Sequence, residues 1–214
     1  MRSTNRPTRF LAFAVLVLAG CASPVTGPTL PDERPAFSQG YGGGNGPTII
    51  ELAADHSPFY NQSVSFWAKA GFSSQGEIYF KDDRGRRGER FARLRINSNS
   101  LLRYPDGRSF AAGDSVLITM RIADTSAVLF EMEPSGLQFR SKKMAELRID
   151  YTEADFDFNK DGVVDALDLA IQQSLAIWMQ EGSAPFEPVA STNLFQVEEI
   201  VAPIPGFSRF AIAY

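Results

Sequence analysis

The chain is poor in the side chains that support several common chemistries. It holds one cysteine and one histidine in 214 residues, which excludes a disulfide framework, a multi-cysteine metal cluster and a di-histidine zinc site. It also lacks positive charge in excess, because its net charge is −4, and this disfavours a nucleic-acid binder. Hydrophobic residues make up 44% and aromatic residues 12% of the chain, enough for one well-buried domain or at most two small ones.

The N-terminus has the features of a secretory signal peptide. Arg2, Arg6 and Arg9 precede an uncharged apolar run from Phe10 to Gly20. This run is shorter than the roughly 20 residues that a membrane-spanning helix needs, whereas its length and flanks fit a signal peptide over residues 1–20. A helix buried in the fold and ending at Gly20 is the alternative.

The sequence Leu18-Ala19-Gly20-Cys21 resembles a bacterial lipobox. The resemblance implies cleavage before Cys21 and attachment of a diacylglyceryl group to its side chain, so that the membrane becomes a partner through the lipid anchor. Ala22 in place of Asp implies sorting to the outer membrane, on its periplasmic or surface face. Cleavage would remove three arginines and no acid, which changes the net charge from −4 to −7.

The next segment predicts a tether. Residues 22–47 hold five prolines and six glycines in 26 residues and show no hydrophobic period. We therefore expect residues 21–47 to be the lipidated cysteine and a flexible linker. The folded domain is expected over residues 48–214.

Short alternating segments follow and predict a mainly β domain. In several of them apolar residues alternate with polar ones, as Leu94 and Ile96 do with Arg93 and Arg95. Segments of this kind, spaced 10 to 15 residues apart with few helical windows, favour an antiparallel sandwich. The expected strands are Ser63–Ala68, Glu77–Lys81, Phe91–Ile96, Ser115–Ala123, Val128–Glu133, one through Leu147, Ile149 and Tyr151, and Phe207–Tyr214.

Several sequence segments in this region resemble the ZU-type β-sandwich domain of ankyrins and netrin receptors. They are Gly-Asp-Ser-Val-Leu-Ile-Thr from residue 113, Glu-Pro-Ser-Gly-Leu-Gln-Phe from residue 133 and the closing Gly-Phe-Ser-Arg-Phe-Ala-Ile-Ala from residue 206. The resemblance covers roughly residues 63–214 and implies an Ig-like sandwich with a binding or structural role and no catalytic residues. Gly206 stands where that family usually has histidine.

One segment has the spacing of metal ligands. Residues 157–168 read Asp-Phe-Asn-Lys-Asp-Gly-Val-Val-Asp-Ala-Leu-Asp, with glycine at position 6, where a calcium loop turns sharply. Oxygen donors spaced in this way wrap around one hard cation, for which calcium suits better than magnesium. The alternative is a solvated acidic turn. The expected calcium ligands are the side chains of Asp157, Asn159, Asp161, Asp165 and Asp168 and the backbone carbonyl of Val163.

The loop resembles that of dockerins, which also end in aspartate at position 12. Asp168 in place of the glutamate of EF-hands implies weaker binding, and the lack of a second loop disfavours cohesin binding. We expect Val164 to face the core and a short helix to begin at Asp165 or Ala166. Its apolar face would consist of Leu167, Ile171 and Leu175 at helical spacing. The helix either continues to Trp178 or gives way near Leu175 to a strand, and we favour the strand.

Other constellations are weaker. A catalytic triad around His56 and Ser57 lacks a nucleophile elbow. Glu131 and Glu133 resemble a paired acid and base, but they fit a solvent-facing strand better. Trp67, Trp178 and Tyr79 would suit a carbohydrate platform, although core packing is the simpler interpretation.

The sequence thus predicts a lipid-anchored cell-envelope protein that is not an enzyme and that binds calcium. A hydrolase of envelope polymers and a dockerin-like module that recruits a partner are the alternatives. The identity of any protein or polymer partner stays open.

Overall fold

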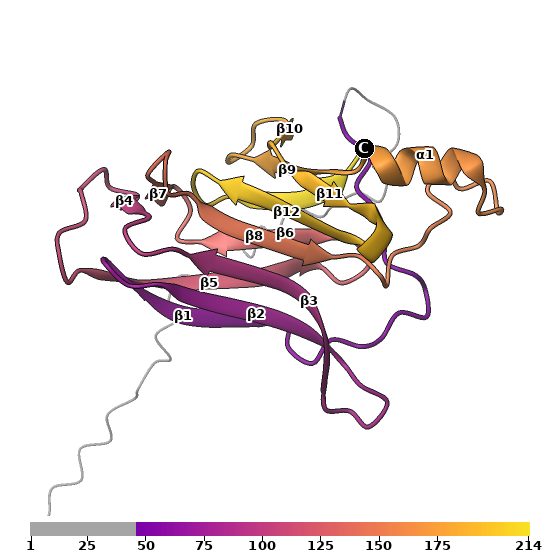
Figure 1. Ribbon diagram of the computed structural model, residues 1–214, viewed down its shortest axis with the longest axis horizontal. Helices are drawn as coiled ribbons and strands as arrows, with labels where there is room; N and C mark the ends of the chain where they lie inside the picture. The colour runs from indigo at the N-terminus through magenta and orange to yellow at the C-terminus, as the bar shows by residue number, and fades with distance from the viewer. Residues whose placement is uncertain (1–45) are drawn as a thin grey trace, which may run out of the picture. The chain divides into compact units, whose positions relative to one another are not determined.

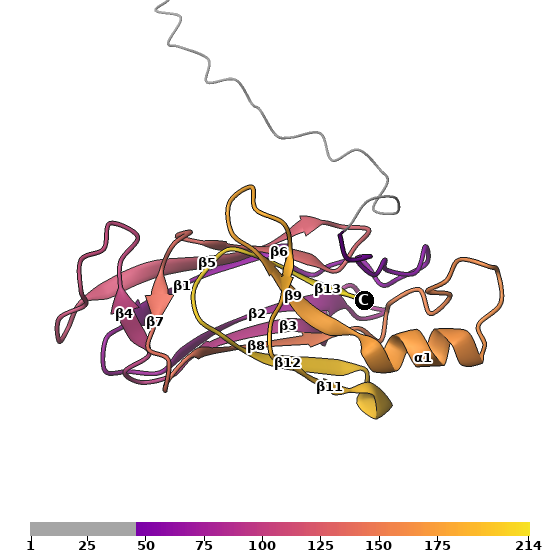
Figure 2. The same ribbon diagram turned by 90° about the horizontal axis from the view of Figure 1, so that it is seen from above.

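Two antiparallel sheets face each other in the computed structural model, which describes residues 46–214 (Figures 1 and 2). The first sheet has the strand order β1-β5-β6-β13-β9-β10. Its strands are β1 (Ser63–Lys69), β5 (Ser115–Asp124), β6 (Leu129–Glu133), β13 (Arg209–Ala213), β9 (Ala176–Gln180) and β10 (Glu187–Pro188).

The second sheet has the order β11-β12-β8-β3-β2. Its strands are β11 (Thr192–Leu194), β12 (Glu199–Ile204), β8 (Ala145–Asp150), β3 (Arg87–Ile96) and β2 (Ser74–Lys81). A separate pair, β4 (Leu101–Arg103) and β7 (Gln138–Phe139), lies at one end of the two layers (Figure 1). The only helices among residues 46–214 are α1 (Ala166–Ser174), at the opposite end, and a 3₁₀ turn over Phe195–Val197. The mainly β, sandwich-like architecture with one short α-helix is therefore confirmed.

The alternating residues fill the space between the sheets. Phe91 of β3 and Phe130 of β6 are fully buried, and their ring centroids lie 5.1 Å apart across the interface. Phe80 of β2 and Phe59 continue this aromatic stack, with centroids 4.9 Å and 5.0 Å apart along it. Offset aromatic contacts at these distances add to the gain from burial, so this stack holds the two layers together.

The last strand departs from simple alternation. In β13, Phe210, Ala211, Ile212 and Ala213 are all buried, because Ile49 and Trp178 cover the outer side of this central strand. The hydrogen bonds between Thr48 and Tyr214 and between Ile50 and Ile212 attach the incoming chain along it. The outer face of the first sheet is thus partly a second, smaller core.

Most expected strands are confirmed, with small shifts in their ends. The strand through Leu147 and Ile149 is β8, which begins at Ala145 and ends before Tyr151. Several elements were not predicted: β12, the short strands β4, β7, β10 and β11, and the start of β3 at Arg87. The helix and the strand after it agree with the expectation, because α1 ends at Ser174 and β9 begins at Ala176.

The expected signal peptide over residues 1–20, Cys21 and the tether up to residue 45 lie outside the described residues. The segment from Gly46 to Tyr214 belongs to one compact unit. Within it, no helix is long and apolar enough to span a membrane.

The aromatic stack predicts that removing a buried aromatic side chain lowers the free energy of unfolding far more than removing an exposed one. Phe130→Ala should lower the free energy of unfolding by about 3–5 kcal/mol, because it opens a cavity between the sheets. Trp67→Ala should change it by no more than about 0.5 kcal/mol, because Trp67 is 64% exposed. Chemical denaturation of both variants measures the two changes, and equal losses would contradict this account of the core.

Candidate metal centre

The candidate calcium loop is inserted between β8 and β9 and leads directly into α1 (Figure 1). Lys160 at position 4 and Gly162 at position 6 both have left-handed backbone conformations, with φ of 59° and 89°. Glycine adopts such a conformation without steric cost. These two residues turn the chain so that residues 157–168 fold back toward their own start.

Backbone N–H groups inside the loop point at its acidic side chains. Asp157 accepts hydrogen bonds from the amides of Asp161 at 3.1 Å and Gly162 at 2.8 Å. Asn159 Oδ1 accepts from the amide of Asp161 at 2.9 Å, and Asp161 Oδ1 accepts from the amide of Val163 at 2.9 Å. The loop is therefore ordered by the same side chains that the sequence singles out as ligands.

Asp168 closes the loop from the first turn of α1. Its side chain accepts hydrogen bonds from the amides of Asn159 at 3.1 Å and Asp165 at 3.0 Å, and the residue is 1% exposed. The amide of Asp165 is the main cause that holds the pKa of Asp168 below its ordinary value; desolvation opposes it, and the amides of Asn159 and Phe158 reinforce it. The carboxylate is thus kept charged at the centre of the loop.

Asp165 begins the helix. Its Oδ1 accepts from the amide of Leu167 at 2.7 Å, which together with the Asp168 contact forms a capping box. The expected start of the helix at Asp165 or Ala166 is confirmed, since Asp165 is the N-cap and Ala166 the first helical residue.

Two residues, Phe158 and Lys160, connect the loop to the rest of the domain. The Phe158 side chain belongs to the main core, and its carbonyl accepts a hydrogen bond of 2.6 Å from the hydroxyl of Tyr214. Lys160 Nζ lies 2.8 Å from Asp155 and 2.9 Å from Glu51, and its hydrogen bond is the largest cause that lowers the pKa of Asp155. The start of the loop is therefore fixed to the body of the domain.

The far end of α1 is also held by polar contacts. Asn193 donates a hydrogen bond of 2.6 Å to the carbonyl of Gln172 and accepts one of 3.0 Å from the hydroxyl of Tyr151. Burial raises the pKa of Tyr151 to about 12. The polar side of the helix, with Asp168 and Gln172 buried, therefore faces the domain.

The expected apolar face is wrong in part. Leu175 is buried and Ile171 partly so, but Leu167 is 62% exposed. Val164, expected to face the core, is 64% exposed, and Val163 and Leu169 are exposed as well. The cause is the capping box: turning Asp168 inward toward the loop amides turns its neighbours Leu167 and Leu169 outward.

The donor set fits a hard cation in its chemistry. Every side chain at loop positions 1, 3, 5, 9 and 12 offers oxygen, and a carboxylate oxygen that accepts one N–H keeps a second lone pair. Among residues 46–214, however, no three His, Cys, Asp or Glu side chains stand together as a metal cage. Asn159 Nδ2 also donates to Asp161 at 3.0 Å, a contact that this amide would give up if Asn159 turned its oxygen to an ion.

Two catalytic alternatives are not assembled. Ser57 Oγ donates to Glu153 at 2.7 Å, while His56 Nδ1 contacts the backbone carbonyl of Ser57 rather than its hydroxyl. Glu131 lies between Arg121 and Arg209 in ion pairs on the outer face of the first sheet. The His56 ring is therefore not placed as a general base for Ser57, and Glu131 is held by two arginines.

The aromatic residues do not form a platform together. Trp67 is exposed on β1 opposite Leu117 of β5, so the expectation that it packs in the core is wrong. Trp178 is half-buried and donates a hydrogen bond of 3.1 Å to the carbonyl of Ala213, and Tyr79 belongs to the second sheet.

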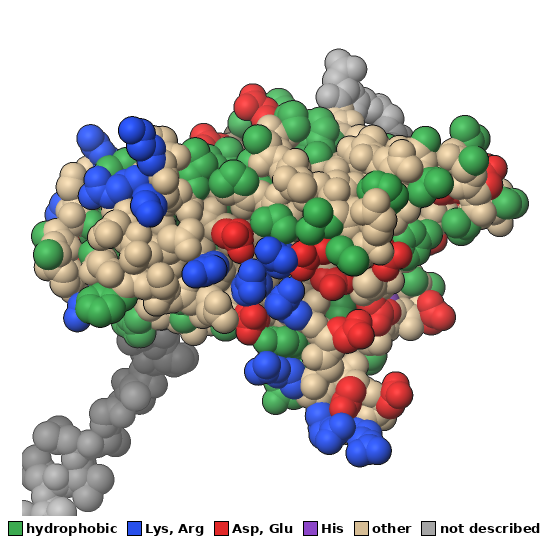
Figure 3. Space-filling view, in the orientation of Figure 1, with side chains coloured by type: hydrophobic (Ala, Val, Ile, Leu, Met, Phe, Trp, Pro, Cys, Tyr) green, Lys and Arg blue, Asp and Glu red, His purple; other side chains and the backbone are tan. Residues whose placement is uncertain are grey.

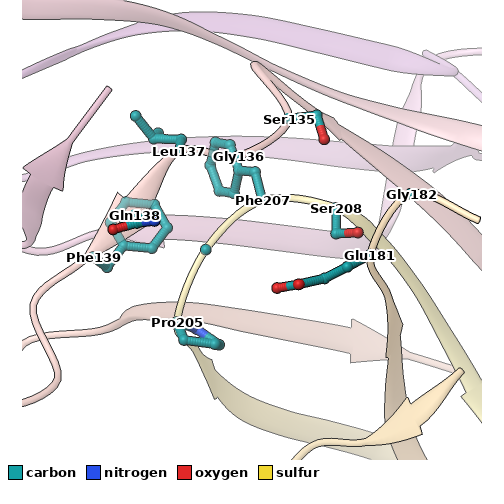
Figure 4. Close-up of a pocket in the computed structure, with 11 residues that line it drawn as sticks. Ser135, Gly136, Leu137, Gln138, Phe139, Glu181, Gly182, Pro205, Phe207 and Ser208 are labelled. Atoms are coloured by element: carbon teal, nitrogen blue, oxygen red, sulfur yellow. The ribbon is translucent and has the colours of Figure 1, made fainter. Parts of the chain in front are cut away.

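An open hollow of about 450 Å³ lies between β7 and the turn before β13 (Figure 4), and Gly206 belongs to its lining. A Cβ atom at this position would stand 2.7 Å from the carbonyl oxygen of Leu137, so histidine does not fit this backbone. Leu137 and Phe207 are buried, and the hydroxyl of Ser208 donates to the carbonyl of Gln180. Glu181 is left as the only charged side chain of the lining.

The contacts of Asp168 predict a specific response to acid. A carboxylate with a lowered pKa contributes stability above its unfolded pKa and loses it as the pH falls toward the folded value. Without calcium, Asp168→Asn should melt at a lower temperature than the parent at about pH 7, with a smaller further loss between about pH 5 and 3. Thermal melts across this range test the difference, with Asp83→Asn, at an exposed turn, as the control. An acid response equal to that of the parent would contradict the assigned role.

Comparisons of the chain with protein-family models, with curated proteins and with solved structures return no match. Function is therefore inferred from the loop, its contacts and the sequence motifs.

Proposed function

We propose that this chain is a lipid-anchored protein of the bacterial cell envelope, with an Ig-like β-sandwich stabilised by calcium in loop 157–168. It serves as a binding or structural module and not as an enzyme. The observation that carries the proposal is the position of Asp168. This buried carboxylate closes a loop of oxygen donors whose other end, at Phe158, is embedded in the core.

Different atoms of the loop residues would coordinate the ion. Asp157, Asn159, Asp161 and Asp168 would offer side-chain oxygens, Val163 its backbone carbonyl, and Asp165 a contact through water, as position 9 often does. Four carboxylates in twelve residues repel one another. A divalent cation supplies the opposite charge, and its binding draws the loop and the first turn of α1 together.

Such an ion stabilises the domain because it binds the folded loop and not the unfolded chain. The stabilised loop is connected to the sandwich by the Phe158 side chain in the core and by the hydrogen bond from the Tyr214 hydroxyl to the Phe158 carbonyl. An aspartate at position 12 suits a weak site, and extracellular modules work with dissociation constants of about 10⁻⁴–10⁻³ M. This agrees with a place outside the cytoplasm.

The anchor follows from the sequence alone. Cys21 is the lone cysteine and falls at the position that a lipobox requires. The proline- and glycine-rich residues 22–47 would hold the domain away from the membrane. We assign the protein to the outer membrane because Ala22 follows the cysteine.

The ion pairs of Glu131 disfavour the hydrolase alternative. Both guanidinium groups beside it, those of Arg121 and Arg209, engage the Glu131 carboxylate in ion pairs, so it is not free to act on a bound polymer. The partner-recruiting alternative stays a prediction, for which the exposed Val163, Val164 and Leu167 are the relevant side chains.

Calcium should raise the melting temperature of the protein. At a free calcium concentration tenfold above the dissociation constant, the stabilisation is about 1.4 kcal/mol, which corresponds to a shift of about 3–6 °C for a domain of this size. The double variant Asp157→Ala/Asp161→Ala should show no such shift. Thermal melts with millimolar calcium and with a chelator measure both.

A second double variant controls for the loss of negative charge. Asp83→Ala/Glu187→Ala removes two exposed acids far from the loop in sequence and should keep the full calcium shift. A parent protein that does not respond to calcium, or a loop variant that responds as strongly as the parent, would rule out the metal site.

Cys21→Ala should release the protein from the membrane fraction. The replacement removes the thiol to which the lipid attaches, and among residues 46–214 no helix is long and apolar enough to cross a membrane. Fractionation of cells and mass spectrometry of the membrane-bound parent test this. A parent that keeps Met1 or carries an unmodified Cys21 would show that the anchor is absent.

A further inference from the structure

A second open hollow, of about 570 Å³, lies on the outer face of the second sheet. Its walls come from the start of β8, the end of β3, β12 and the loops that follow β1, β3 and β7. Three cationic side chains line it, those of Arg95, Lys142 and Lys143, together with the serines 73, 98 and 141 and Asn97. This hollow is at the end of the domain that carries β4 and β7, where Figure 3 shows Lys and Arg side chains gathered.

The three cations lack carboxylate partners among residues 46–214. Arg95 lies opposite Glu146 in the ladder between β3 and β8. The Glu146 carboxylate instead pairs with Arg93 at 3.1 Å and lies 4.0 Å from Arg148, so the one acid in the lining is already engaged. Lys142 and Lys143 form no ion pair within the described part of the chain and are exposed. Unpaired cations in a chain of net charge −4 point to a ligand of opposite charge.

The walls of the hollow are fixed to one another. Asn97 Nδ2 donates a hydrogen bond of 3.2 Å to the carbonyl of Met144, and the amide of Ser98 donates one of 3.1 Å to the hydroxyl of Ser73. The amide of Arg140 bonds to the carbonyl of Ser100 at 2.8 Å. These bonds join three loops that are far apart in sequence, so the backbone segments that carry the cations are held in place before a ligand arrives, which lowers the entropic cost of binding.

We propose that this hollow, which we name the basic hollow, binds a phosphate group. Three cations exceed the charge of a single carboxylate, whereas a phosphate monoester carries up to two negative charges and three acceptor oxygens. Arginine binds such oxygens in pairs, lysine acts as a point charge, and serine hydroxyls donate to the remaining oxygens. The phosphate belongs either to a soluble ligand or to a lipid headgroup. This inference does not depend on the calcium site or on the anchor.

The test uses the full chain with Cys21→Ala, which cannot be lipidated, in a buffer with chelator and low salt. Inorganic pyrophosphate is titrated in and followed by heteronuclear NMR. We expect saturable binding, with the largest shifts at residues 95–98 and 141–144, and weaker binding as salt is added. Lys142→Gln/Lys143→Gln should weaken it by about tenfold or more.

The matched control removes the same charge elsewhere. Arg84→Gln/Arg86→Gln lies in the exposed turn between β2 and β3 and should leave the affinity within about twofold of the parent. Equal weakening by both double variants would reduce the effect to general attraction and overturn the proposal. Shifts spread over the surface without saturation would also overturn it.

A parallel sedimentation assay separates the two sources of phosphate. Vesicles of phosphatidylglycerol are compared with vesicles of phosphatidylcholine. Binding of the parent to the first, lost in the lysine double variant, assigns the basic hollow to lipid headgroups. Binding of pyrophosphate without vesicle binding assigns it to a soluble phosphate ligand, and binding of neither probe overturns the proposal.

Discussion

The contact between Phe91 and Phe130 is the interaction on which the rest of the domain depends. It crosses the space between the two sheets, and Phe80 and Phe59 extend it to one side. Burial of this kind is non-directional and large, about 1.5–3 kcal/mol for each fully buried phenylalanine side chain. Because the layers are held mainly by their inner faces, the loops at the two ends contribute single apolar side chains such as Phe158 to the core, and their polar residues are available for other chemistry.

The loop before α1 is organised on a different principle. Charged side chains there are matched by backbone N–H groups, and Asp168 accepts hydrogen bonds from amides near the start of the loop, at Asn159, and in its later part, at Asp165. A buried carboxylate without such partners would cost several kcal/mol. Meeting this requirement fixes the rotation of the helix, and the exposure of Leu167 is the consequence.

Alternation with period two predicted the strands well because one side of each faces a core. It placed the centres of β1, β3, β5 and β6 and failed for β4, β7, β10 and β11, which have only two or three residues each and no room for a period. Helical spacing placed α1 but gave the wrong face, since periodicity assumes that apolar side chains are the ones buried. The prediction that Trp67 packs in the core failed for a related reason. Its strand alternates as expected, but the tryptophan occupies a position that faces outward. Sequence spacing singled out Asp157, Asn159, Asp161 and Asp168 as one set, and hydrogen bonds link these residues within the loop. Whether they hold an ion stays a prediction, and the burial of Asp168 depends on contacts that spacing does not encode.

Charge is distributed unevenly between the ends of the domain, and net charge conceals this. The acidic loop lies next to α1 at one end of the domain, and β4 and β7 lie at the other (Figure 1). The basic hollow is lined by the loops that follow β1, β3 and β7, toward this second end. One strand reaches both: β8 begins at Ala145 in the wall of the hollow and ends at Asp150, just before Tyr151, whose hydroxyl bonds to Asn193 beneath the helix. If the acidic loop and the basic hollow were adjacent, their charges would neutralise each other. Because they are separated by the length of a strand, the loop can attract a cation and the hollow an anion. Between the two ends, Arg148 pairs with Glu199 at 2.6 Å and Arg93 with Glu146, so the middle of this face is self-compensated. The ends are therefore the parts of this face where charge remains to attract an ion from solution.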